Sequence, residues 1–393
     1  MKLFKQFFGI IAIISLIFAF TACDFLFGDE DKKDNNDNEV KIIVEPLLKT
    51  KWSQGSPYNT KLRELAGTEV GDINDLTINI CGIVGWTQIM RYHKHPAQGV
   101  GQNEAWIHNN GKNLPPVNFE VNFDWDNMLY TYTSSATKQQ RNYVAELYYI
   151  ISIGRVDGNL PKTVNNFGFD KSIQRLDRVY YDDATWEKIL KEQLDAGLPV
   201  GYQGRGNANH FFVIDGYDNA GKFHVNWGWG GNHDGWYFIN NLNPSNYLFN
   251  DYNRHHMIIN FMPDKGGTSS GYKLALRDFS VNKTSVAQNE LFTVSTQVSN
   301  ISSLDTFQGG RWGVALVDIN DNIITIIGNW SIQALTTSWS TLVMSRDISV
   351  PENVSLGHYR LKIAVIATDE DWNIITLSRI GDGVPNSIPL EVR

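Results

Sequence analysis

The chain has 393 residues, of which 42% are hydrophobic and twelve are tryptophan, and its formal net charge is −8 at pH 7. A chain of this length has room for two folded domains, and its apolar content suits well-packed cores. The net negative charge argues against a nucleic-acid partner, because surfaces that bind phosphate groups are normally basic.

Residues 1–22 have the pattern of a bacterial export signal. Lys2 and Lys5 precede an uncharged apolar run at residues 7–20, and small residues follow. The sequence Phe-Thr-Ala-Cys at 20–23 resembles the lipobox of bacterial lipoproteins. That resemblance implies cleavage before Cys23, a lipid on Cys23, and a protein anchored in the bacterial outer membrane by that lipid alone. The alternative is an ordinary secretory signal cut after small residues.

Residues 23–43 are dominated by acidic and amide side chains. So few apolar residues cannot offset the chain entropy lost on folding, and we expect a disordered acidic tether. Acidic residues directly after a lipidated cysteine also resemble the surface-export signal of Bacteroidetes lipoproteins, which implies a place on the cell surface. A tether that is acidic only because it must stay soluble is the alternative.

Cys81 precedes a run of apolar residues at helical spacing, which we expect to end before Pro96. At the N-terminus of such a helix, free amides and the helix dipole favour a thiolate, so we predict a lowered pKa for Cys81. The alternative is a structural core cysteine. Once Cys23 carries a lipid, Cys81 has no disulfide partner, and an odd cysteine in an exported chain indicates a reactive thiol.

Further elements are expected between residues 116 and 263. Residues 143–153 are predicted as a buried helix, 158–166 as a loop and 185–196 as an amphipathic helix. Strands are predicted at 211–216, 222–227 and 236–239, with tight turns between them.

A thiolate nucleophile needs a base beside it and a group that orients the base. His210 opens a predicted strand after a glycine-rich loop, and Asn226 lies near the end of the next strand. Antiparallel pairing of the two strands is expected to bring Asn226 beside His210, where its amide would hold the imidazole in one tautomer. Trp227 would shield that hydrogen bond, and Gln54 would donate to a developing oxyanion. Taken singly, His210 is typical of a surface histidine, Asn226 of a turn residue and Gln54 of a solvated loop residue.

Four pieces of sequence together resemble the streptopain family of papain-like cysteine peptidases. They are Trp-x-Gln-x-x-Pro-Tyr-Asn at 52–59, Cys-x6-Gln-Ile-Met-x-Tyr-His-x-x-Pro at 81–96, His-x-Phe-Val-Ile-Asp-Gly at 210–216 and His-Val-Asn-Trp-Gly-Trp-Gly-Gly at 224–231. The resemblance covers residues 44–263 and implies an α+β papain-like fold. It implies that Cys81 is the nucleophile and His210 the general base, oriented by Asn226 with help from Trp227. Gln54 and the Cys81 amide would form the oxyanion hole.

The chain departs from the family pattern near the nucleophile, with Ile80 before Cys81 and the large Trp86 after it. These departures bear on substrate preference and on the efficiency of turnover. Fewer than thirty residues lie between Cys23 and Trp52, too few for the domain-sized pro-segment that streptopain-like enzymes carry. We therefore expect control by export or by a separate inhibitor protein.

Residues 264–271 have the composition of a linker. Residues 272–393 contain short runs in which apolar and polar residues alternate, and turns separate these runs. Seven or eight such runs predict an all-β sandwich of immunoglobulin-like type, acting as a spacer or an adhesive module. Five acidic residues there are interpreted as turn formers and not as a calcium site: Asp318, Asp321, Asp369, Glu370 and Asp371.

No metal and no cofactor are expected. The context of His93 and His95 resembles a helix end of the streptopain family, and His255-His256 has no nearby carboxylate or cysteine partner in the sequence. The favoured function is an exported, membrane-anchored cysteine endopeptidase acting on protein or peptide substrates. The alternative is a weakly active or inactive peptidase-fold protein that acts at the surface as an adhesin or substrate-binding module.

Overall fold

The computed structural model describes residues 39–67, 80–108, 111–337, 340–367 and 371–393. Residues Val40–Arg393 form one unit, and every described helix and strand belongs to it. The expected signal peptide, the lipidated Cys23 and most of the tether lie outside the described residues. So do Asp369 and Glu370.

The expected tether ends earlier than residue 43. Strand β1 (Ile42–Val44) pairs antiparallel with β8 (Asn209–Asp218), with Ile42 opposite Asp218 and Val44 opposite Tyr217. The backbone groups of β1 are satisfied by a sheet, so the prediction that disorder reaches residue 43 is wrong at its C-terminal end.

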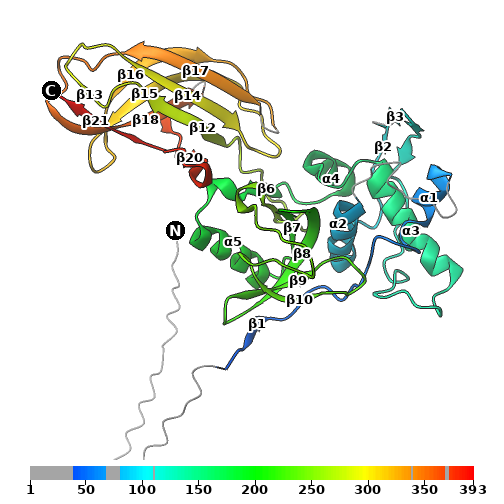
Figure 1. Cartoon of the computed structure of the whole chain (residues 1–393). Coiled ribbons are helices and arrows are strands. Elements are labelled where there is room, and N and C mark those ends of the chain that lie inside the picture. The colour runs from blue at the N-terminus through cyan, green and yellow to red at the C-terminus, as the bar shows by residue number, and fades with distance from the viewer. Residues whose placement is uncertain (1–38, 68–79, 109–110, 338–339, 368–370) are drawn as a thin grey trace, which may run out of the picture. The chain divides into compact units, whose positions relative to one another are not determined.

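The N-terminal part, up to residue 263, combines helices with one large sheet (Figure 1). The helices are α1 (Thr60–Ala66), α2 (Ile80–His93), α3 (Lys138–Ile153), α4 (Leu160–Phe167) and α5 (Asp183–Asp195), with short 3₁₀ turns at Arg178–Tyr180 and Tyr252–Arg254. Small hairpin strands are β2 (Gln102–Asn103), β3 (Trp106–Ile107), β4 (Asn113–Leu114) and β5 (Val117–Asn118). The sheet contains β1, β6 (Gln174–Asp177), β7 (Val200–Arg205), β8, β9 (Lys222–Asn226), β10 (Gly235–Phe238) and β11 (His256–Ile259).

The order of the large sheet is β10-β9-β8-β7-β11-β6, with β1 paired to β8. Successive residues of a strand point to opposite faces, and β8 shows this clearly. Phe211 and Val213 pack into the core formed by α2 and α3, whereas Phe212 and Ile214 pack into the core that contains α5. The sheet therefore separates two apolar cores, and β8 lies between them.

The helices agree with the predictions except in one segment. The predicted helices at 143–153 and 185–196 correspond to α3 and α5, and α3 begins earlier because Thr137 and Gln140 form a capping box. The predicted loop at 158–166 is wrong, because α4 occupies most of it. Asn159 caps α4 by accepting a hydrogen bond from the Lys162 N–H.

The C-terminal part consists of strands in two sheets. The strands are β12 (Leu274–Val281), β13 (Ser285–Val286), β14 (Phe292–Asn300), β15 (Gly310–Val317), β16 (Ile323–Ile332), β17 (Thr341–Ile348), β18 (Gly357–Ala367), β19 (Asn373–Ile374), β20 (Leu377–Ser378) and β21 (Ile388–Val392), and a 3₁₀ turn lies at Ile380–Asp382. One sheet has the order β17-β14-β12-β20 and the other β13-β21-β18-β15-β16, with β19 paired to β18.

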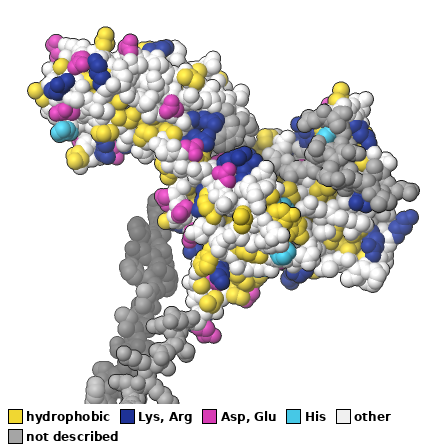
Figure 2. All heavy atoms as spheres, in the orientation of Figure 1, with side chains coloured by type: hydrophobic (Ala, Val, Ile, Leu, Met, Phe, Trp, Pro, Cys, Tyr) yellow, Lys and Arg dark blue, Asp and Glu magenta, His cyan; other side chains and the backbone are white. Residues whose placement is uncertain are grey.

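One apolar core joins both sheets of the C-terminal part. It contains Leu276 of β12 and Val294 of β14 from one sheet, and Val314 of β15 and Ile363 of β18 from the other. The predicted all-β character is present, while the immunoglobulin-like type stays a prediction. On the face shown in Figure 2, acidic and basic side chains are both spread over this part.

Candidate active site

Cys81 occupies the first turn of α2, as the sequence predicts. The body of α2, from Gly82 to Arg91, is buried, because the helix packs between α3 and β8. Cys81 itself is half-buried and forms no disulfide among the described residues. The thiol is thus held at the buried end of a helix and remains chemically available.

The predicted lowering of the Cys81 pKa is wrong in direction. Burial raises the pKa of the Cys81 thiol, and hydrogen bonds from the backbone of Phe211 and Gly82 offset this only in part. The negative charge of nearby Asp157 raises the pKa further. Removal of the thiol from water therefore outweighs the amides at the helix terminus, which were the basis of the prediction.

His210 lies at the start of β8, and the backbone N–H that contacts the Cys81 thiol belongs to its neighbour Phe211. The structure therefore brings together the two segments that carry the expected nucleophile and base. The His210 side chain is buried, and burial lowers its pKa to about 4, although its hydrogen bond to Trp227 acts in the opposite direction.

The hydrogen bond of His210 defines its tautomer. Nε2 lies 2.8 Å from the backbone carbonyl oxygen of Trp227. A carbonyl only accepts hydrogen bonds, so Nε2 must carry the proton, and Nδ1 of the neutral ring is then the basic nitrogen. A backbone carbonyl thus performs the orienting role that the sequence assigns to a side-chain amide.

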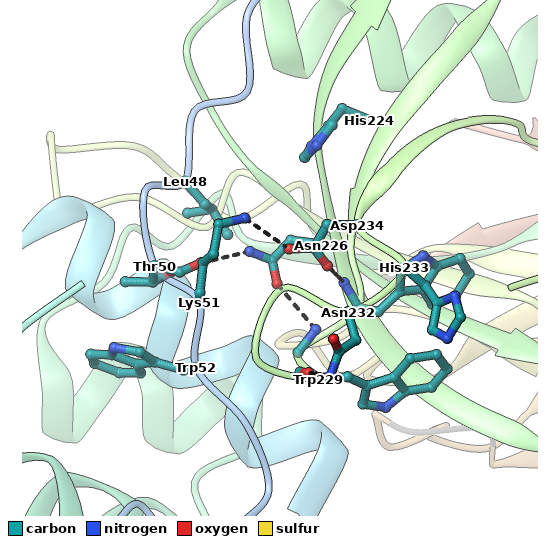
Figure 3. Close-up of polar contacts among 12 residues, drawn as sticks. Leu48, Thr50, Lys51, Trp52, His224, Asn226, Trp229, Asn232, His233 and Asp234 are labelled. Atoms are coloured by element: carbon teal, nitrogen blue, oxygen red, sulfur yellow. Dashed lines mark hydrogen bonds and ion pairs between the residues drawn. The ribbon is translucent and has the colours of Figure 1, made fainter. Parts of the chain in front are cut away.

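Asn226 does not contact His210, which corrects the sequence-based expectation. Its Nδ2 donates to the Thr50 carbonyl at 2.9 Å, and its Oδ1 accepts from Gln88 Nε2 and the Gly228 N–H, each at 3.1 Å (Figure 3). Asn226 lies opposite Val213 in the β8–β9 pairing. Its side chain therefore joins the N-terminal segment, α2 and the end of β9.

The register explains which residues do reach His210. Asn226 is paired with Val213 and is the last residue of β9, so the residues that reach His210 come from the turn that follows β9. The Trp229 ring stacks on His210 with 4.7 Å between centroids, whereas the Trp227 ring lies at 6.2 Å. The Asn226–His210 hydrogen bond that Trp227 was expected to shield is not formed, and Trp229 is the ring nearer to His210.

The Trp227 backbone is itself held in place. Its N–H donates to Asp234 Oδ1 at 2.9 Å, and the other oxygen of Asp234 lies 3.6 Å from Lys51 Nζ. Figure 3 shows Asp234 next to Asn226, with Lys51 and Thr50 close by. These contacts fix the carbonyl that orients His210.

Gln54 lies in the loop before α1. Its backbone carbonyl accepts a hydrogen bond from Asn59 Nδ2 at 2.7 Å, and its side chain is half-buried. The oxyanion role expected for Gln54 stays a prediction.

Gln88 is a positioning residue that the sequence reasoning missed. Its side chain is fully buried, and its Oε1 accepts from the Thr50 hydroxyl at 2.8 Å while its Nε2 donates to Asn226. A glutamine two turns after Cys81, on an otherwise apolar helix, was the available signal. Asp234 and Trp229 were visible as members of the glycine-rich motif, but their contacts depend on the fold.

Two further features bear on the site. Among the described residues, no group of three or more His, Cys, Asp or Glu side chains is arranged to hold a metal ion. Within the same residues, no helix has both the length and the apolar character needed to cross a membrane.

Comparison with known proteins gives a consistent result. Residues 52–237 match the model of the Peptidase C10 family. Streptopain of Streptococcus pyogenes is 30% identical over 229 residues, covering 52% of this chain and 57% of streptopain. The thiol protease/hemagglutinin PrtT of Porphyromonas gingivalis is 26% identical over 214 residues, covering 51% of this chain and 24% of that protein.

Among solved structures, the active wild-type interpain A cysteine protease of Prevotella intermedia is similar to this chain. It is 29% identical, with 56% of this chain and 95% of that one covered, and the TM-score is 0.48. The chain spans little more than half the length of streptopain. Residues 52–237 therefore match a Peptidase C10 (streptopain-like) domain, and the curated relatives of this region are named streptopain and thiol protease.

Proposed function

We propose that this protein is a cysteine endopeptidase that cleaves peptide bonds with Cys81 as nucleophile and His210 as general base. The observation that carries the proposal is the meeting of α2 and β8. The Cys81 thiol contacts the backbone N–H of the residue after His210, and the Trp227 carbonyl leaves Nδ1 of His210 as the basic nitrogen.

The chemistry proceeds in two stages. Cys81 Sγ attacks the substrate carbonyl while His210 Nδ1 accepts the thiol proton. His210 then gives this proton to the leaving amine as the C–N bond breaks, which leaves a thioester on Cys81. Water, deprotonated by His210, attacks the thioester and releases the acid and the free thiol. The Cys81 amide and the Gln54 side chain are proposed to stabilise the oxyanion in both stages.

The resting pair is uncharged in this proposal. Burial raises the pKa of Cys81 and lowers that of His210 to about 4, so both shifts favour a neutral thiol and a neutral imidazole. The proton therefore moves from sulfur to Nδ1 during attack, when the substrate has replaced water in the site. Asn226 supports this arrangement indirectly, by holding Thr50, Gln88 and Gly228.

Export and lipid attachment at Cys23 are proposed to place the enzyme at the outer membrane, where protein or peptide substrates are available. The basis is the sequence of residues 1–23. Control by export or by a separate inhibitor protein also remains part of the proposal. Labelling of cells with radioactive palmitate tests the anchor, because the label should appear in the wild type and disappear in Cys23→Ser.

Hydrolysis of casein and of fluorogenic peptides tests the enzyme function. The wild type should cleave both, while Cys81→Ala and His210→Ala should lose about 10³-fold or more, as removal of a nucleophile or its base does in related chemistry. His233→Ala serves as a control, because His233 is exposed. Equal background rates for the wild type and Cys81→Ala would contradict the proposal.

The second candidate is a weakly active or inactive surface protein that binds its target. Two observations favour this candidate. The pKa of Cys81 is raised, and Asn226 is paired with Val213 instead of lying opposite His210. A peptide epoxide separates the candidates. It should label Cys81 in the purified, unprocessed wild type if the site is active, and a site without reactivity would leave the thiol unmodified.

A further inference from the structure

A pocket of about 550 Å³ lies beside the expected reacting groups. Its lining includes Gly82 and Trp86 of α2 and Phe211 of β8. Gly82 directly follows Cys81, and Phe211 directly follows His210. A peptide held at Cys81 would therefore have a side chain close to the mouth of this pocket.

Part of the lining comes from a distant region of the sequence. Ile301, Ser302 and Ser303 line the pocket, although they belong to the connection between β14 and β15 in the C-terminal part. The Peptidase C10 match ends at residue 237, so this wall lies outside the matched region.

Residues 301–303, which form this wall, contact both the N-terminal and the C-terminal part of the chain. Ser303 Oγ accepts a hydrogen bond from the Arg175 backbone N–H at 3.0 Å, which joins it to β6. The Ile301 N–H donates to the Lys273 carbonyl at 2.8 Å, and the Ile301 side chain packs beside Tyr180. Leu304 packs against the core that contains α2 and α3. These contacts make the segment a fixed part of the pocket.

The rest of the lining favours a large side chain. Trp86, Leu160, Phe211 and Ile258 supply apolar surface from four different elements of the N-terminal part. Pockets that bind organic groups are mainly apolar with a few polar groups at fixed positions. The volume exceeds what a small side chain such as alanine would fill.

The charged residues of the pocket favour a neutral substrate side chain. The Arg175 guanidinium pairs with Asp177 at 2.7 Å, while the Arg155 guanidinium is exposed and lies over the Trp106 ring at 5.0 Å. Burial raises the pKa of Asp157 to about 7, so its carboxyl group is largely protonated at slightly acidic pH. A basic substrate side chain would find no fully ionised carboxylate in this lining, and the one lining cation without an ion pair among the described residues, Arg155, is exposed to solvent.

We propose that residues 301–303 form one wall of the substrate side-chain pocket and limit the size of the large neutral side chain that it accepts. The strand-rich C-terminal part thereby helps to determine cleavage specificity. This inference rests on the proposed function, because the pocket governs turnover only if Cys81 acts on peptides.

Two substitutions with opposite effects test the inference. Ser303→Trp should fill the pocket and Ile301→Ala should enlarge it. Each variant is assayed on peptides with Ala, Leu or Phe at each of the two positions on either side of the scissile bond. At the peptide position whose side chain enters the pocket, Ser303→Trp should lower the ratio of kcat/KM for Phe over that for Ala about tenfold. Ile301→Ala should raise the same ratio about threefold.

The controls are Ser355→Trp and Ile319→Ala, which make the same changes at exposed positions of the C-terminal part. Their ratios should match the wild type. Thermal unfolding confirms that each variant is folded, and Ile301→Ala keeps the test decisive if Ser303→Trp does not fold. The inference would be overturned if the folded variants kept the wild-type ratio of kcat/KM for Phe over Ala. It would also be overturned if kcat/KM fell equally for the Ala, Leu and Phe peptides.

Peptide binding separates this inference from the proposed function. Calorimetry on Cys81→Ala, alone and combined with each pocket variant, measures affinity for the same peptides without turnover. If the wild type hydrolyses no peptide but these affinities follow the predicted size dependence, the enzyme proposal fails and the pocket assignment holds. If no peptide binds, or if the affinities ignore both substitutions, the pocket assignment fails.

Discussion

His210 shows how its surroundings set the chemistry of a single residue. Its ring is covered by Trp229 and lies near Trp227 and Phe249, and this burial lowers its pKa to about 4. A histidine with an ordinary pKa near 6.5 would be largely protonated at pH 5. In this site the imidazole stays neutral there, so it remains able to accept the proton of Cys81.

Trp229→Ala should change the pH dependence of the reaction. Uncovering His210 exposes its ring to water, so its pKa should rise from about 4 towards the ordinary value. The acid limb of the kcat/KM profile should then move to higher pH, and NMR titration of the His210 ring protons should show the same shift. Trp236→Ala is the control, because that ring contacts His224 at 5.3 Å instead. An acid limb and a titration midpoint that stay in place would contradict this account.

At the scale of elements, the site depends on how closely α2 approaches β8. A Cβ atom added at Gly85 would lie 2.6 Å from Cδ1 of Phe211, which is too close for two carbon atoms. Gly85 is unfavourable within an isolated helix, but it lets the helix that carries Cys81 pack directly against the strand that carries His210. Gln88, one turn further on, connects the same helix to Thr50 and Asn226.

Gly85→Ala should therefore destabilise the protein despite the better helix propensity of alanine. Overpacking costs roughly 1–3 kcal/mol, against a gain of about 1 kcal/mol from propensity. Urea unfolding at constant pH measures the difference. The double variant Gly85→Ala/Phe211→Leu should recover part of the loss, because the smaller side chain removes the contact. A single variant more stable than the wild type would show that the contact is unimportant.

At the scale of the whole molecule, buried ionisable groups link stability to pH. Burial lowers the pKa of His93, His210 and His255 to about 4 each. In the unfolded chain these histidines titrate near pH 6.5, so the unfolded state binds more protons between pH 6.5 and 4. Asp157 acts in the opposite direction, because burial raises its pKa to about 7 and its proton favours the folded state.

Burial also lowers the pKa of His256 and raises the pKa of Asp177 and Asp234. The free energy of unfolding should therefore fall as the pH is lowered from 6.5 to 4, since four histidines outweigh three carboxyl groups. Urea midpoints measured at half-unit intervals across this window check the sign. His255→Gln should reduce the slope if the variant folds, because it removes one of the groups whose pKa is lowered to about 4. A midpoint that is constant or rises on acidification would contradict the prediction.

The sequence by itself determined the helix that begins at Cys81, the strand that begins at His210 and the strand-rich character of residues 272–393. Apolar spacing, a helix-stopping proline and alternating strands are local signals, and they agree with α2, β8 and the later strands. The motif order also identified the Peptidase C10 domain. Local composition did not reveal β1, because β1 is stabilised by pairing with the distant β8. Helix α4 was missed although Asn159 at its start and Gly168 at its end are local signals.

Only the tertiary structure decided how the site is assembled. The orienting group is the Trp227 carbonyl, and a backbone carbonyl has no signature in the sequence. Asn226 was misplaced because the short turn between β8 and β9 sets a register in which Asn226 lies opposite Val213, three residues from His210. The direction of the Cys81 pKa shift depends on burial, and residues 301–303 reach the pocket only because the two parts of the chain pack together. Each of these is a property of long-range packing, which no local stretch of sequence contains.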